Sequence, residues 1–315
     1  MNRDQLNKEL RKKKINAVYI THEGKNIYEY YKNKKQKEKL HKINSCTKSV
    51  ISILMGIALD KGYLDSIHLP VYQFFPELFE AQEDKRKMDI TIHHLLTMSD
   101  GLHFPEFGEW NCFAPMTYHD DIVKFVIDRP MVHYPGKHMN YNSGCSHVLS
   151  AIIQKVTKMK TEDFANEHLF KPLGIQQYHW YADKMKINKG ADGLILKIED
   201  MSKIGLLVLQ NGTFNGKKIV SSQWIKEATT PHLCTYDYIG HYGMHWWVNK
   251  LDEEQEFSYD NTFYFALGFG GQYIIISPPI NLVVTIASET YDDSFKPMKI
   301  IRNIVLDNKL GVNEI

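Results

Sequence analysis

The sequence lacks the features that define several broad classes of protein. It has no run of about 18 apolar residues, so no segment is predicted to span a membrane as a helix. Its first residues, MNRDQLNKELRKKK, contain no apolar stretch of the kind found in a secretory signal. The formal net charge of +1 gives no global electrostatic reason for binding nucleic acid or an anionic membrane. We therefore expect a cytoplasmic protein that binds neither nucleic acid nor membranes.

Cysteine is scarce, and internal repeats are absent. The four cysteines follow no zinc-binding spacing, and a chain of 315 residues can bury a sizeable core without disulfide bonds. The 43% hydrophobic and 24% charged residues are typical of a globular protein. Two basic runs, residues 8–14 and 32–42, contain no aromatic residue, and we interpret them as a solvated helix face and a solvated hairpin loop. We expect no metal and no cofactor, and the sequence leaves the oligomeric state open.

Strand patterns occupy both ends of the chain, and helical patterns occupy the middle. Residues 15–33 predict a hairpin, and residues 241–288 contain several strand-like segments. Between them lie several segments with helical spacing, and a final helix is predicted near residues 295–306. This order predicts an α/β fold of the α+β type, with an antiparallel sheet built from both chain ends and flanked by helices. The predicted domains are a sheet domain, residues 1–66 and 190–315, and a mostly helical inserted domain, residues 67–189.

The segment NSCTKSVISILMGIALDKG, residues 44–62, predicts a helix with one broad apolar face. Ser45 and Lys48 lie on its first turn, and positions i and i+3 of a helix are neighbours. A serine needs an adjacent base to act as a nucleophile, and a lysine becomes a base when its charged form is disfavoured. The helix N-terminus adds positive potential and N–H groups that could bind an oxyanion. The alternative is a helix cap followed by an exposed lysine.

Two further segments carry possible chemistry. Tyr141-Asn142-Ser143-Gly144 precedes a predicted helix, where the tyrosine could exchange a proton and Asn142 or Ser143 could hydrogen-bond the lysine. The alternative is a tyrosine that covers the edge of the core. In residues 266–271, ALGFGG, glycine would let a substrate approach the end of a strand closely, although a plain hairpin is an equal interpretation.

In this order and spacing, the three segments resemble the serine β-lactamase and penicillin-binding superfamily. The resemblance covers residues 15–306 and includes DITIHHLLTMSDGL and GFGGQYIIISPPINLVV. It is greatest to the branch of class C β-lactamases, D-alanyl-D-alanine peptidases, esterases and 6-aminohexanoate-dimer hydrolases. It implies that Ser45 is the acylated nucleophile, Lys48 its base or proton partner, and Tyr141 a second acid/base group. It also implies an oxyanion hole formed by the backbone N–H groups of Ser45 and Phe269. Expected substrate contacts are Asn142, Ser143, Gly268 and Trp110.

Two departures from the superfamily pattern narrow the expected activity. Ser143 stands at the third position of Tyr-x-Asn, and Ala266 replaces the lysine of Lys-Thr-Gly that helps to hold the carboxylate of penicillins. We therefore expect a serine hydrolase that acts on small esters or amides. The alternatives are a β-lactamase or D-alanyl-D-alanine carboxypeptidase, and a non-catalytic binding protein with this fold.

Other conspicuous residues are expected to be structural. Adjacent positions such as His93 and His94 point about 100° apart on a helix, which does not suit a shared metal. Cys46 is expected to be a small buried residue. Of the aromatic cluster at residues 242–247, one tryptophan at most is expected to line a pocket. Trp110 lies in an aromatic loop that could cap a cleft.

Overall fold

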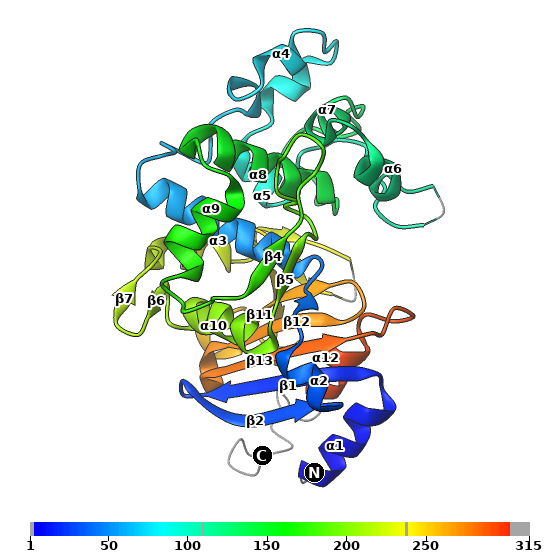
Figure 1. Cartoon of the computed structure of the whole chain (residues 1–315). Helices are drawn as coiled ribbons and strands as arrows, with labels where there is room; N and C mark the ends of the chain where they lie inside the picture. Colours follow the sequence, from blue (N-terminus) through cyan, green and yellow to red (C-terminus); the bar gives the residue numbers. More distant parts are fainter. Residues whose placement is uncertain (1–2, 109, 237–238, 303–315) are drawn as a thin grey trace.

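The largest sheet is built from both ends of the chain. The computed structural model describes residues 3–108, 110–236 and 239–302, and within them this sheet has eight antiparallel strands in the order β2-β1-β13-β12-β11-β10-β9-β8 (Figure 1). The predicted fold class is thereby confirmed. The strands are β1 (Ile15–His22), β2 (Lys25–Tyr31), β8 (Leu233–Cys234), β9 (His241–Tyr242), β10 (Trp247–Lys250), β11 (Thr262–Gly268), β12 (Gln272–Ser277) and β13 (Leu282–Ser288).

The central strands are buried on both faces. Every residue of β12 and β13 is buried, because helices cover the sheet on each side. Helices α3 (Cys46–Asp60) and α10 (Ile198–Leu209) pack on one face, and α1 (Arg3–Lys12) and α12 (Lys296–Ile301) lie on the other. This explains why these two strands are nearly continuous runs of isoleucine and valine rather than an alternation of apolar and polar residues.

Helix α3 is buried on all sides. The sequence predicts a single apolar face, but every residue from Cys46 to Ala58 is buried, polar ones included. The helix lies between the sheet and two other helices, α8 (Ser143–Thr157) and α11 (Ser222–Ala228). The indole N–H of Trp224 on α11 donates to the Ser52 carbonyl at 3.1 Å. The helix that begins at the Ser45 turn is therefore held rigidly by its neighbours.

A helical region lies above the sheet in the view of Figure 1. Local capping starts its short helices: the side chain of Thr91 accepts from the His94 N–H, and that of Asp121 accepts from the Lys124 N–H. The elements of this region are η1 (Val71–Gln73), α4 (Pro76–Phe79), η2 (Lys85–Asp89), α5 (Ile92–Leu96), α6 (Phe113–Tyr118), α7 (Ile122–Ile127), α8, α9 (Thr161–Ala165) and η3 (Asn166–Phe170). The domain boundaries at residues 66 and 190 stay a prediction.

The basic segment 32–42 differs from the expected hairpin loop. It forms the short helix α2 (Lys34–Glu38) and the strand β3 (His41–Lys42), and β3 pairs with β5 of a small sheet. The final helix ends at Ile301, and the rest of its predicted range, from residue 303, lies outside the described residues. The remaining elements are β4 (Tyr178–Trp180), β5 (Leu194–Leu196), β6 (Thr213–Phe214), β7 (Lys217–Lys218), η4 (Tyr259–Asn261) and η5 (Pro278–Ile280).

Candidate active site

Ser45 and Lys48 are in direct contact at the start of α3. Ser45 occupies the N-cap position, but its hydroxyl makes no capping hydrogen bond. Lys48 Nζ instead donates to Ser45 Oγ at 2.9 Å. The Lys48 side chain is 1% exposed, so the alternative of a cap followed by an exposed lysine does not describe this turn. The preceding residue, Asn44, has φ 48°, a left-handed conformation that asparagine adopts more readily than most residues.

The second partner of Lys48 is a backbone carbonyl from a distant loop. Its Nζ donates to Ala191 O at 3.0 Å. This loop runs against the start of α8, and only glycine fits at position 190, where a Cβ would lie 2.0 Å from Ser146 O. Sequence reasoning did not find Ala191, because a carbonyl acceptor supplied by the fold leaves no signal in residue type.

Tyr141 lies beside this pair. Its ring centroid is 5.0 Å from Lys48 Nζ, and the side chain is buried. Burial raises the pKa of the Tyr141 phenol, and the charge of Lys48 and a hydrogen bond with Ser45 oppose this rise only in part. The phenol is therefore protonated at neutral pH and can donate a proton. The fold brings together all three residues expected to be catalytic.

The end of β11 meets the turn before Ser45. Asn44 Nδ2 donates to Phe269 O at 2.6 Å, and a Cβ on Gly268 would lie 2.3 Å from Ile43 O, so glycine is required there. Within the described residues, the backbone N–H groups of Ser45 and Phe269 have no hydrogen-bond partner. Free N–H groups from two adjacent segments are what an oxyanion hole needs. Glycine is needed at position 268 for packing against the chain's own backbone, and its expected contact with a substrate stays a prediction.

Residues 13–306 match the protein family described as Beta-lactamase. The chain belongs to the beta-lactamase family. A curated relative, "Beta-lactamase-like protein 4" of Dictyostelium discoideum, is 27% identical over 199 residues. That match covers 55% of this chain and 33% of the relative, so the chain spans about a third of that protein's length.

Solved structures show the same fold. The "Putative 6-aminohexanoate-dimer hydrolase from Bacillus anthracis" is 21% identical with a TM-score of 0.78, over 94% of this chain and 79% of that one. "EstCE1, a hydrolase with promiscuous acyltransferase activity" is 15% identical with a TM-score of 0.79, over 95% and 96% of the two chains. A family VIII carboxylesterase is 16% identical with a TM-score of 0.70, over 91% and 90%. At these identities the likeness establishes the fold.

Asn142 has partners other than Lys48, contrary to expectation. Its side-chain oxygen accepts from the Gly144 N–H at 2.8 Å, and its amide nitrogen lies 3.4 Å from Asp100 Oδ2. The side chain is fully buried. The physical reason is that the first N–H groups of α8 need acceptors, and an asparagine before a helix supplies one. The expectation that Asn142 contacts the lysine is therefore wrong.

Ser143 stands where the superfamily pattern Tyr-x-Asn has an asparagine. It forms hydrogen bonds with Glu106. Its Oγ donates to Oε1 of Glu106 at 2.6 Å, and its N–H donates to Oε2 at 3.1 Å. Burial raises the pKa of the Glu106 carboxyl, although the charge of Lys48 and the bonds from Ser143 oppose this rise. Sequence reasoning missed Glu106 and expected Ser143 to reach the lysine or the substrate. The available signal was that Glu106 directly precedes the aromatic loop of Trp110, which could cap a cleft.

Phe107, rather than Trp110, is the aromatic residue of this loop that reaches the site. Trp110 is 90% exposed and so buries little surface against the described chain, which gives no support for a capping role. The Phe107 ring stacks on Tyr141 with centroids 5.7 Å apart. On the strand side, Trp247 also stacks on Tyr141 at 5.7 Å, whereas Trp246 is fully buried. One tryptophan of the cluster therefore contacts the site, as expected.

The adjacent residues His93 and His94 have two further histidines nearby. The ring centroids of His68 and His232 each lie 5.4 Å from that of His93. Nevertheless, no group of three or more His, Cys, Asp or Glu residues in the described ranges is arranged to hold a metal ion. Cys46 is buried as expected, its thiol donates to Gln272 O at 3.4 Å, and burial raises its pKa. No helix in the same ranges is long and apolar enough to cross a bilayer.

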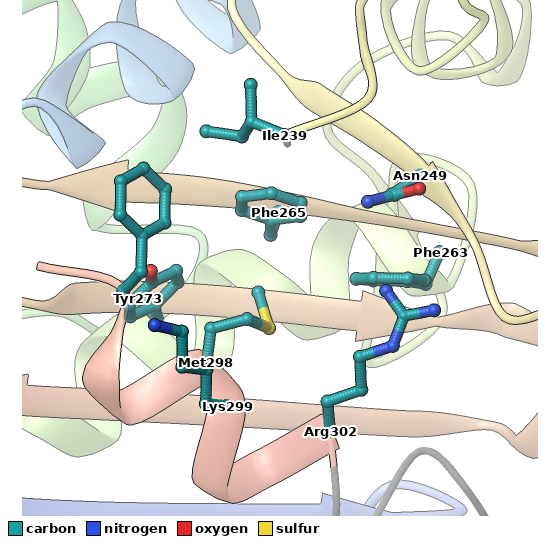
Figure 2. Close-up of a pocket in the computed structure, with 9 residues that line it drawn as sticks. Ile239, Asn249, Phe263, Phe265, Tyr273, Met298, Lys299 and Arg302 are labelled. Atoms are coloured by element: carbon teal, nitrogen blue, oxygen red, sulfur yellow. The ribbon is translucent and has the colours of Figure 1, made fainter. Parts of the chain in front are cut away.

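A separate cavity of about 360 Å³ lies between the sheet and the C-terminal helix. Figure 2 shows Met298 and Lys299 of α12 and the adjoining Arg302 beside aromatic side chains of the sheet. Neither Ser45 nor Lys48 lines it. Its lining residues are Ile239, Asn249, Phe263, Phe265, Tyr273, Phe295, Met298, Lys299 and Arg302. Its lining includes no serine or cysteine beside a base, whereas the Ser45 site pairs a hydroxyl with an adjacent amine.

Proposed function

We propose that this chain is a serine hydrolase that forms an acyl-enzyme on Ser45 and acts on small esters or amides. The observation that carries the proposal is the hydroxyl of Ser45, 2.9 Å from the buried amine of Lys48 at a helix N-terminus. A nucleophile beside a buried amine, with free N–H groups nearby, suits acyl transfer. Membership of the beta-lactamase family and the likeness to esterase and amide-hydrolase folds support it.

In the proposed acylation, Lys48 acts as a neutral amine and takes the proton of Ser45, relayed through the Tyr141 hydroxyl, as the Ser45 Oγ attacks the carbonyl carbon. The carbonyl oxygen becomes an oxyanion that accepts hydrogen bonds from the N–H groups of Ser45 and Phe269. Each such donor contributes on the order of 3 kcal/mol to the transition state. When the tetrahedral intermediate collapses, the bond to the leaving group breaks, and Tyr141 returns the proton to the departing alcohol or amine.

Deacylation repeats these steps with water in place of Ser45. A water oxygen attacks the acyl carbon, and its proton passes to the pair formed by Lys48 and Tyr141. The Ser45 Oγ then leaves with that proton, which releases the acid and restores the hydroxyl. In each half of the cycle the pair thus accepts a proton as base and then returns one as acid.

The residue at position 266, near the end of β11, narrows the expected substrate class. Ala266, which replaces the lysine of Lys-Thr-Gly, is 1% exposed and carries no charge. A penicillin carboxylate would therefore lose the cation that the superfamily pattern places there. This supports a preference for simple esters or amides over β-lactams.

The experiment is a hydrolysis assay with 4-nitrophenyl butanoate. We expect Ser45→Ala to lose at least about 10³-fold in kcat, and Ser222→Ala, which removes an exposed serine on α11, to leave it unchanged. Full activity in Ser45→Ala would refute the mechanism. Stable acylation by a penicillin in a parallel tube would favour a β-lactamase or peptidase. No hydrolysis by the unmodified chain would favour a binding protein.

A further inference from the structure

Glu106 is a carboxylate at the candidate active site without an ion-pair partner. Its two oxygens each accept one hydrogen bond, and both come from Ser143. A carboxylate has about four acceptor positions, so about two remain open. Among the described residues, no lysine, arginine or histidine lies within ion-pair distance of it. Partly buried charges are normally paired, so this one lacks a cation in direct contact.

The charges around Glu106 favour a cation from outside the chain. Lys48 is within electrostatic range, but its Nζ already donates to Ser45 Oγ and Ala191 O. Asp192, a second carboxylate, also acts on Glu106 and adds negative potential. At position 266, an alanine stands in place of the cation that the superfamily pattern would supply. Compared with the superfamily pattern, the site therefore lacks a lysine that attracts anions, and it holds a carboxylate, Glu106, that attracts cations.

An exposed aromatic ring adjoins this carboxylate. Phe107 follows Glu106 in the chain, stacks on Tyr141 at 5.7 Å, and is 69% exposed. The face of an aromatic ring attracts cations, and aromatic rings recur at sites that bind ammonium groups. The ring and the carboxylate thus favour the same kind of ligand through different interactions.

We infer that Glu106 and the ring of Phe107 select substrates carrying a positively charged amino group. This inference rests on the proposed function and adds a substrate class to it: cationic esters or amides. Glu106 would accept hydrogen bonds from the ammonium through its open positions, while the scissile carbonyl lies at Ser45. The other role for the carboxylate would be to act only as a counter-charge for Lys48.

The test compares matched substrates that differ in charge. For the acyl side we would use the 4-nitrophenyl esters of 6-aminohexanoate, heptanoate and adipate, which are cationic, neutral and anionic at similar length. For the leaving-group side we would compare 4-(aminomethyl)phenyl butanoate, whose amine is protonated at neutral pH, with 4-ethylphenyl butanoate, its neutral analogue. We expect kcat/KM for the cationic substrate of at least one pair to exceed that of its neutral partner by about tenfold, which corresponds to about 1.4 kcal/mol.

Variants test whether Glu106 causes this preference for cationic substrates. Glu106→Gln should reduce the ratio of cationic to neutral kcat/KM by about tenfold, and Phe107→Leu should reduce it a few-fold. Asp120→Asn is the matched control, because Asp120 lies in the same part of the chain, pairs with Lys184 and is 85% exposed. It should leave the ratio unchanged. Thermal unfolding of each variant checks that it is folded.

The outcomes separate this inference from the proposed function. If Ser45-dependent hydrolysis is present but neither pair shows a cationic preference, the inference fails and the proposed function stands. If Glu106→Gln lowers kcat/KM equally for the cationic and the neutral substrate of a pair, the carboxylate acts as a counter-charge, and the inference again fails. If no ester is hydrolysed and a fluorophosphonate does not label Ser45, the inference and the proposed function both fail.

Discussion

Lys48 is the residue whose environment most needs an explanation. An amine that is 1% exposed is costly to bury, and its hydrogen-bond partners are a hydroxyl and a carbonyl rather than a carboxylate. Nearby His245 adds no second charge, because burial and the charge of Lys48 lower the pKa of its imidazole to about 3. A buried amine held in this way is better explained by chemistry than by stability.

Lys48→Met should therefore separate stability from activity. Methionine fills a similar volume without a buried charge, so we expect an unchanged or higher free energy of unfolding, by up to about 3 kcal/mol. Ester hydrolysis should fall by at least about 10²-fold. Urea unfolding and the hydrolysis assay measure the two effects.

A second buried lysine provides the control for that experiment. Lys87 is 4% exposed, donates to Gln82 Oε1 at 2.5 Å and Ile127 O at 2.6 Å, and lies away from the site. Lys87→Met should change stability but keep activity. A Lys48→Met protein with full activity, or one that fails to fold while Lys87→Met folds, would contradict this account of Lys48.

At the scale of elements, the site lies where three of them meet. The N-terminus of α3 carries Ser45, the N-terminus of α8 follows Tyr141, and the end of β11 precedes Phe269. A fourth segment, the loop before β5, supplies the carbonyl that Lys48 bonds. This loop is tied to α8 by the pair His147 Nε2 and Asp183 Oδ2, 2.9 Å apart and almost fully buried.

Removing this pair should loosen the loop. Burial raises the pKa of Asp183, but the hydrogen bonds from His147 and the Ile187 N–H outweigh burial, so the net pKa is lowered and the carboxylate is charged at neutral pH. His147→Ala would leave that charge unpaired, at an expected cost of about 3 kcal/mol in the free energy of unfolding. His179→Ala, which removes an exposed histidine, is the control and should cost less than about 1 kcal/mol. Similar losses in the two variants, measured by urea unfolding, would show that the pair does not hold the loop.

At the scale of the whole molecule, histidines that are buried or half-buried make stability depend on pH. Burial lowers the pKa of His41 and of His93 to about 4, and that of His245 to about 3. In the unfolded chain these groups titrate near 6.5. Their contribution is therefore complete above pH 6.5 and is lost as the pH falls toward 4, because only the unfolded state then binds the protons.

We expect the free energy of unfolding to fall on the order of 5 kcal/mol between pH 7 and pH 5, since each histidine contributes about 1.4 kcal/mol per pH unit. Urea titrations at several pH values measure this slope. His93→Asn should reduce the slope by about a third, and His179→Asn should leave it unchanged. Equal stability at pH 7 and pH 5 would contradict the assignment of these imidazoles as neutral.

Contacts between residues close in the chain were predicted better than contacts between residues that the fold brings together from distant segments. Ser45 and Lys48 were predictable because helical spacing alone makes them neighbours, and Tyr141 followed from the family resemblance. Glu106 and Ala191 were not, because loops distant in sequence bring them to the site. The interpretation of Asn142 was wrong because the backbone of α8 competes for its side chain, a preference that its position before a helix could have indicated.

The central claim is that Ser45 is an activated nucleophile. The measurement that tests it most directly is the intact mass of the protein after exposure to a fluorophosphonate, with Ser45→Ala alongside. The account predicts a single adduct on the unmodified chain, located at Ser45 by peptide mapping, and none on the variant. An unlabelled protein, or an equal adduct on Ser45→Ala, would contradict it.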